Sequence, residues 1–95
     1  MKHGSFDKPD IDHTVIECQA RINSGLAWRL EGSYGRAAMQ AIEDGYCLLG
    51  PRSLLDFWGN RVPSRTEVRP GTKGSILYVA DRHGADYATQ IAEVQ

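Results

Sequence analysis

The residues with the clearest chemical potential are four cations at a regular spacing of four: Arg61, Arg65, Arg69 and Lys73. Side chains four residues apart point to the same side of an extended chain, so this basic row could follow a line of phosphates. Each phosphate contact would add affinity that falls as salt rises. An acidic protein surface would suit the same row, and a solvated rim that protects an edge strand is the third interpretation. The spacing therefore predicts a contact surface and leaves the partner open.

The basic row lies within a turn-rich stretch, Trp58–Ser75, that reads WGNRVPSRTEVRPGTKGS. Its prolines and glycines exclude a long helix, so the spacing of four cannot mark one helix face. Trp58 and Asn60, at the start of the stretch, complete the set of residues that we expect to bind a partner. Glu67 is the only acidic residue in the stretch.

The cysteines and histidines do not form a metal-binding pattern. Cys18 and Cys47 have no C-x-x-C spacing, and the three histidines are scattered along the chain, at positions 3, 13 and 83. Both cysteines are expected to act as small core residues rather than as a disulfide, which a reducing cytosol disfavours. No metal or cofactor is predicted.

Catalytic and nucleotide-binding motifs are also weak. The segment RPGTKGS differs from a phosphate-binding loop because Lys73 precedes the last glycine rather than following it. The serines, aspartate and histidine of the same region lack nucleophile-elbow spacing (Ser64, Ser75, Asp81 and His83). A helix-turn-helix is not predicted either, because Pro51 interrupts the segment that would be its recognition helix. We therefore expect a protein that is not an enzyme.

Size and charge limit the remaining possibilities. A chain of 95 residues makes one domain with a modest core, here expected over 12–95 after a flexible lead-in at 1–11. The net charge is −1, yet residues 52–73 carry five basic and two acidic side chains. The whole chain therefore has no basic field that would draw it to nucleic acid. The absence of a long apolar run and of a signal-like N-terminus favours a cytoplasmic protein without membrane contact.

The elements that must position the basic row begin with two helices. Thr14 and Glu17 have the spacing of a capping box, and an apolar stripe follows from Val15 to Leu30. Gly25 either bends this helix or splits it, and the continuity of the stripe favours one helix. Ser33 can cap a second helix and Gly45 suits the position just after its end, so residues 14–31 and 33–44 predict an αα-hairpin. Small residues on its face, Gly35, Ala38 and Ala41, could also pack against a second copy, which makes a homodimer an open alternative.

The second half of the chain predicts smaller elements. Ser53–Trp58 has the spacing of a short helical turn, and its large apolar side chains (Leu54, Leu55, Phe57 and Trp58) favour a core position over an exposed aromatic patch. Arg69-Pro70-Gly71-Thr72 has the residues of a type II turn, which predicts a short β-hairpin around 65–79. In the competing interpretation Ser75 caps a helix over 76–82. Residues 85–94 predict a C-terminal helix.

These patterns together predict an α+β fold dominated by helices. The function that fits them is a small non-enzymatic binding module that recognises a protein partner through residues 58–75. The alternative is a nucleic-acid-binding protein that places Arg61, Arg65, Arg69 and Lys73 on phosphates.

Overall fold

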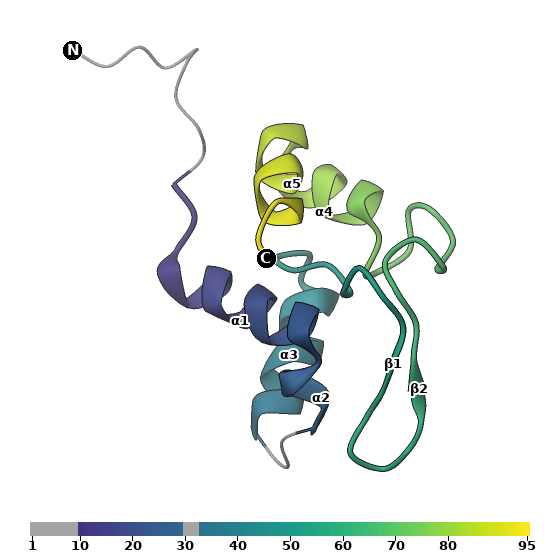
Figure 1. Ribbon diagram of the computed structural model, residues 1–95. Helices are drawn as coiled ribbons and strands as arrows, with labels where there is room; N and C mark the ends of the chain where they lie inside the picture. Colours follow the sequence, from purple (N-terminus) through teal and green to yellow (C-terminus); the bar gives the residue numbers. More distant parts are fainter. Residues whose placement is uncertain (1–9, 30–32) are drawn as a thin grey trace, which may run out of the picture.

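The fold of the chain is given by a computed structural model, which describes residues 10–29 and 33–95 (Figure 1). Its helices are α1 (His13–Ser24), α2 (Leu26–Arg29), α3 (Ser33–Glu43), α4 (Ile76–His83) and α5 (Ala85–Ala92). Two short antiparallel strands, β1 (Leu54–Leu55) and β2 (Arg61–Val62), lie between α3 and α4 in the sequence. The predicted helix-dominated α+β class is confirmed. Most of the predicted lead-in, residues 1–9, lies outside the described residues.

The first predicted helix is divided at Gly25, so the expectation of one continuous helix is wrong. Gly25 has a φ of 87° and ends α1 in the left-handed conformation, and α2 then starts at Leu26. A Cβ at Gly25 would lie 3.1 Å from Cδ1 of Leu54, which comes from β1. The apolar stripe continues across the break because both helices pack against α3. Periodicity alone therefore could not reveal the division.

The cap of α1 is formed by Asp12 rather than by Thr14. The carboxylate of Asp12 accepts hydrogen bonds from the backbone N–H and the hydroxyl of Thr14, both at 2.9 Å. The backbone donor and then the hydroxyl lower the pKa of Asp12. Glu17 lies 3.0 Å from His13 instead of turning back to the helix start. The predicted capping box is therefore replaced by a single aspartate cap.

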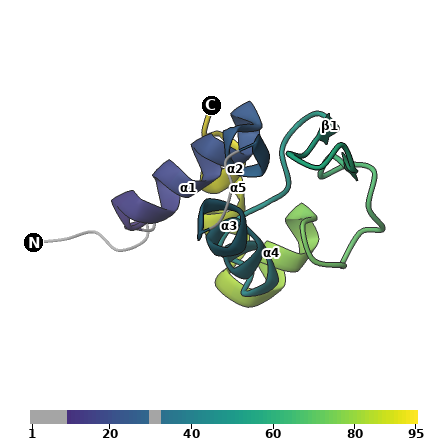
Figure 2. The same cartoon turned by 90° about the horizontal axis from the view of Figure 1, so that it is seen from below.

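The predicted αα-hairpin is confirmed, since both of its regions are helical. The small residues of α3 pack against other helices of the same chain. Ala38 is fully buried and packs with Ile22 and Trp28. A Cβ at Gly35 would lie 3.5 Å from the carbonyl oxygen of Ala27 in α2. This face is thus covered by α1 and α2, which lie beside α3 in both views (Figure 1, Figure 2).

A buried segment after α3, residues 47–50, divides the core into two clusters. Leu49 packs with Ile22 and Trp28, whereas Leu48 packs with Val79 and Ile91 of α4 and α5. The neighbouring side chains of Leu48 and Leu49 therefore join the α1–α3 half of the molecule to the α4–α5 half. Because this segment is buried, its backbone groups need partners from elsewhere in the chain.

Side chains of α1 and of the 64–67 turn supply several of these partners. Gln19 accepts from the backbone N–H of Leu48 at 2.7 Å and donates to the Leu48 carbonyl at 3.0 Å. Arg65 donates through Nε to the Leu49 carbonyl at 2.8 Å and through Nη2 to Oδ1 of Asn23 at 3.0 Å. Gln19, Asn23 and Arg65 form a polar network that fixes the 64–67 turn against α1.

The segment 76–83 is a helix, so the predicted β-hairpin around 65–79 is wrong. The turn predicted at the centre of that hairpin, residues 69–72, does form. The Thr72 N–H donates to the Arg69 carbonyl at 3.0 Å, and Gly71 has a φ of 91°. The chain then enters α4, capped by the Ser75 hydroxyl, which accepts from the Tyr78 N–H. Strand propensity depends on context, and here burial of Val79 against α5 outweighs it.

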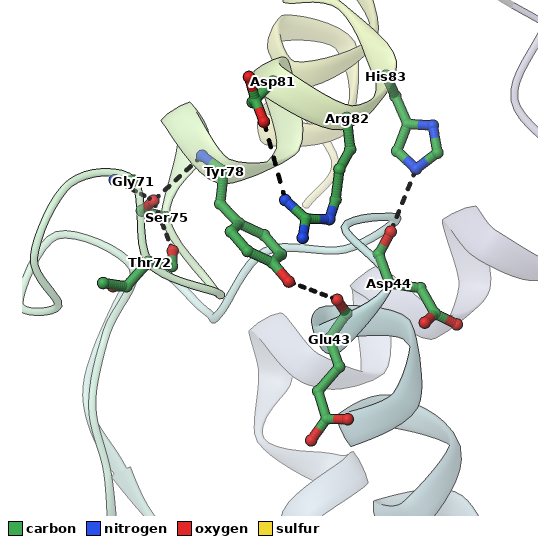
Figure 3. Close-up of polar contacts among 9 residues, drawn as sticks. All are labelled: Glu43, Asp44, Gly71, Thr72, Ser75, Tyr78, Asp81, Arg82 and His83. Carbon is green, nitrogen blue, oxygen red and sulfur yellow. Dashed lines mark hydrogen bonds and ion pairs between the residues drawn. The ribbon is translucent and has the colours of Figure 1, made fainter.

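Figure 3 shows how α4 is held on the end of α3. The hydroxyl of Tyr78 donates to the Glu43 carbonyl at 2.6 Å, and the His83 ring lies 3.3 Å from the Asp44 carbonyl. The Arg82 guanidinium lies 3.8 Å from the Tyr78 ring centroid. Tyr78 thus satisfies a carbonyl in the last turn of α3, and His83 contacts the carbonyl of the residue that follows this helix.

Ser75 provides a direct check of the helix over 76–83. Its buried hydroxyl accepts from the Gly71 N–H at 3.0 Å and donates to the Thr72 carbonyl at 2.7 Å, in addition to capping α4. We expect Ser75→Ala to lower the free energy of unfolding by about 1–2 kcal/mol, measured by urea titration. Ser53→Ala, at an exposed serine, is the matched control and should change it by less than about 0.5 kcal/mol. Equal effects of the two substitutions would contradict this assignment.

The strands of the structure lie earlier in the sequence than predicted. Leu54 pairs with Val62 and Leu55 with Arg61, and a tight loop over 56–60 joins them. The expected helical turn at Ser53–Trp58 is therefore absent. The core position expected for its apolar cluster is wrong for three of the four residues, because Leu55, Phe57 and Trp58 are exposed and only Leu54 is partly buried.

The predicted C-terminal helix is confirmed as α5, which packs on α4 through Ala88 and Ile91. The helices within residues 10–29 and 33–95 all fall short of the length and hydropathy of a membrane span.

Candidate binding groove

A groove of about 740 Å³ lies between the helical pair α2–α3 and the β1–β2 hairpin. One wall carries Trp28 of α2 with Arg36 and Met39 of α3. The opposite wall is built by the 56–63 segment and by residues of the 68–73 loop. A volume of this size is in the range of pockets that bind ligands or anchoring side chains.

Aromatic side chains border the groove and remain open to solvent. Trp58 is 72% exposed and Phe57 is 51% exposed, and their rings form an edge-to-face pair with centroids 4.9 Å apart. Met39, across the groove on α3, is also exposed. Trp28 is buried and packs into the core beneath them. The groove thus has an apolar base and an exposed apolar rim.

The loop that presents Phe57 and Trp58 is held by hydrogen bonds. The Oδ1 atom of Asp56 accepts from the backbone N–H groups of Trp58 at 2.9 Å and Asn60 at 2.8 Å. The Phe57 N–H donates to the Trp28 carbonyl at 2.6 Å, which ties the loop to the opposite wall. The exposed aromatic pair is therefore positioned before any partner arrives, which reduces the ordering cost of binding.

Three cations line the groove, and two of them have acidic neighbours. Arg61 forms an ion pair with Glu67, and Lys73 lies 3.4 Å from Glu43. The hydrogen bond from the Ser64 N–H is the main cause of a lowered pKa at Glu67, and Arg61 lowers this pKa further. Arg36 forms no ion pair with any residue that the structure describes, and it is exposed.

The structure separates the six residues predicted to bind a partner. Trp58, Arg61 and Lys73 line the groove, whereas Asn60 and Arg69 are exposed outside its lining. Arg65 turns inward to the polar network, and burial lowers the pKa of its guanidinium. The basic row is therefore not continuous along one side of the chain, because its second member has a structural role.

Sequence reasoning missed the helical wall of the groove. Arg36 and Met39 are three residues apart on α3 and so share one helix face, which their spacing could have indicated. Trp28 of α2 is buried in the core cluster. Its indole Nε1 has no hydrogen-bond partner among residues 10–29 and 33–95. No sequence signal connects these residues to a loop about twenty positions later.

The serine, aspartate and histidine residues considered above for a catalytic motif make contacts within the fold. Ser75 caps α4, and Asp81 lies 3.9 Å from Arg82 on the same helix. The His83 ring stacks on Tyr46 with centroids 4.4 Å apart. In the part of the chain that the structure describes, no three His, Cys, Asp or Glu residues gather as a metal site.

The two cysteines are free and adjacent within the core. The neighbouring Cys47 thiol, helped by Arg21 and opposed by burial, lowers the pKa of Cys18 to about 7. The same contact with Cys18, together with burial, raises the pKa of Cys47. Cys18 is therefore the more acidic thiol of the pair.

Alkylation of the folded chain with iodoacetamide should show this difference. We expect the Cys18 rate to reach half its maximum near pH 7, while buried Cys47 stays unmodified, measured by mass spectrometry across a pH series. Because the folded pKa lies below the ordinary value of 9.0, the unfolded state binds more protons between these values. The Cys18 contribution to stability should thus grow as pH rises through this window. A midpoint near pH 9, unchanged in Cys47→Ala, would contradict the assignment.

Comparison with known proteins matches residues 6–54 to a family described as a domain of unknown function, DUF7417. The match takes in more than half of the chain, so this protein belongs to that family. No curated protein and no solved structure matches the chain. The matched span includes α1, α2 and α3, and so the helical wall of the groove, and it ends at Leu54 in β1.

Proposed function

We propose that this protein is a non-enzymatic binding module that takes an apolar segment of a protein partner into the groove between α2–α3 and the β1–β2 hairpin. The observation that carries the proposal is the pair of exposed rings, Phe57 and Trp58, fixed beside an apolar groove. A chain of 95 residues has little apolar area to leave in solvent, so an exposed patch beside a groove favours a docking role.

The residue types of the groove also support a protein partner. Tryptophan, phenylalanine, methionine and arginine are enriched at protein interfaces, and all four occur in the lining. Tryptophan and arginine are also the side chains whose truncation most often weakens binding strongly. Trp58 and Arg36 combine these features with exposure, which makes them the expected energetic centre of the interface.

A phosphate-binding role for the basic row has less support. The Arg65 guanidinium donates to the Leu49 carbonyl and to Asn23. Arg61 and Lys73 have carboxylate neighbours. A nucleic-acid backbone would have to compete with these acids for each contact. The exposed rings could stack on unpaired bases, so nucleic acid is the alternative that the experiment below must separate.

Selection from a display library of random 16-residue peptides tests the proposal. The full chain should enrich peptides that are lost when Trp58→Ser is used as bait, with affinity reduced about tenfold or more. The matched control is Leu77→Ser, which removes another exposed large apolar side chain, on α4 and outside the groove lining. This control should retain the enriched peptides, because Leu77 does not contact the groove.

Two results would overturn the proposal. One is enrichment that the Trp58→Ser bait retains, which would place the binding surface elsewhere. The other is the absence of enriched peptides together with a salt-dependent mobility shift of mixed single-stranded DNA and RNA, which would favour the nucleic-acid alternative.

A further inference from the structure

We propose that the partner segment is an apolar anchor flanked by acidic residues, and that Arg36 is the residue that selects the acid. This inference rests on the proposed function and specifies the chemistry of the partner. It starts from the charge of the groove, which the apolar lining alone does not determine.

The charged side chains of the lining are three cations and one acid: Arg36, Arg61, Lys73 and Asp56. Asp56 already uses its Oδ1 atom to hold the 56–60 loop through two backbone N–H groups. Glu43 and Glu67 balance Lys73 and Arg61 from outside the lining. Arg36 is therefore the cation of the lining that has no ion-pair partner among the described residues.

The position of Arg36 connects this charge to the apolar part of the groove. Arg36 precedes Met39 by one helical turn on α3, and the exposed rings of Phe57 and Trp58 are on the opposite wall. An anchor side chain between the walls would place the flanking residues of the partner beside the rim, where the cations lie. A carboxylate there gains a bidentate partner in Arg36, whereas a lysine would meet like charges.

Arg61 and Lys73 strengthen the preference for acidic over basic flanking residues. Arg61 and Lys73 are themselves exposed, so an acidic flank can approach them as well. Each exposed pair is worth only a few-fold in affinity. The expected preference is thus about fivefold for acidic over neutral flanks and about twentyfold or more for acidic over basic flanks.

Three matched libraries of 12-residue peptides test the inference on the full chain. All share a randomised apolar centre of Leu, Ile, Phe, Met and Trp, and they differ only in four flanking residues, which are Glu, Gln or Lys. We expect the Glu-flanked library to be enriched most over the Trp58→Ser bait and the Lys-flanked library least. With Arg36→Glu as bait, the order of the Glu and Lys libraries should reverse or become equal.

Arg52→Glu is the matched charge control, since Arg52 is exposed and lies outside the groove lining. This bait should retain the preference for Glu flanks. Equal enrichment of all three libraries, or an order that Arg36→Glu leaves unchanged, would overturn the acidic partner while the proposed groove function stands. If none of the libraries is enriched over the Trp58→Ser bait, both the inference and the proposed function are overturned.

Discussion

Gln19→Leu is expected to lower the free energy of unfolding by about 3–5 kcal/mol, the largest effect of any single substitution considered for this chain. Gln19 is fully buried, and its amide replaces the backbone partner that Leu48 would have in a sheet. Leucine has a similar volume, so the substitution removes the hydrogen bonds without opening a large cavity. The Leu48 N–H and carbonyl would then be buried without partners, and each such group is destabilising by about 1–3 kcal/mol.

Urea unfolding followed by circular dichroism measures this effect. Gln40→Leu is the matched control, because Gln40 is exposed on α3 and its side chain bonds to exposed Asp44. The control should change the free energy of unfolding by less than about 0.5 kcal/mol. A small effect of Gln19→Leu, similar to that of the control, would show that the 47–50 segment is not held by α1. The union of the two core clusters would then need another explanation.

Arg65→Met is expected to lower the free energy of unfolding by about 2–4 kcal/mol. The guanidinium donates to the Leu49 carbonyl, to Asn23 and, at 3.4 Å, to the Ala92 carbonyl. These three acceptors belong to the 47–50 segment, to α1 and to α5, so one side chain joins three parts of the fold. Methionine retains much of the aliphatic packing but leaves the acceptors without their donor.

The control for Arg65 is Arg69→Met, four residues later in the same basic row. Arg69 is exposed and forms no ion pair within the described ranges, so its replacement should change stability by less than about 0.5 kcal/mol. If the four cations acted as one phosphate-binding row, both substitutions would instead leave stability unchanged and weaken binding alike. Denaturant titration of the two variants separates these accounts.

Local sequence signals were sufficient for the helical half of the fold. The apolar spacing over residues 14–44 and the glycine at position 45, whose φ is 80°, specify the two packed helical regions. The sequence assigned the cap to Thr14, whereas Asp12, two residues earlier, forms it. The split at Gly25 depends on the approach of Leu54, which lies 29 positions later, so no local pattern could decide it.

Tertiary contacts decided the second half of the chain. Residues 76–83 have strand-forming side chains, but Val79 is buried against α5 and Tyr78 bonds to the end of α3. The type II turn before them was predictable from its proline and glycine, whereas the elements that flank it were not. Local propensity is a weak guide where a short segment is covered on two sides.

The candidate site was predictable only on one wall. The spacing of four indicated Arg61 and Lys73, and the turn-rich stretch indicated Trp58. These three residues do line the groove. The same spacing also included Arg65, because a regular interval does not tell whether a cation faces solvent or the core. Arg36 and Met39 could be assigned to a common helix face but not to a groove, since the opposite wall comes from a separate hairpin.

The most direct test of the proposed groove uses the two tryptophans of the chain, one in each wall. The peptide bound most tightly in the random selection is titrated into ¹⁵N-labelled protein, and the indole N–H signals are followed by NMR. We expect the indole signals of both Trp28 and Trp58 to shift with one common dissociation constant. The backbone amide signals of Val79 and Ile91 should not shift. Saturable binding that leaves both indole signals unchanged, and shifts amides of α4 and α5 instead, would contradict the groove as the binding site.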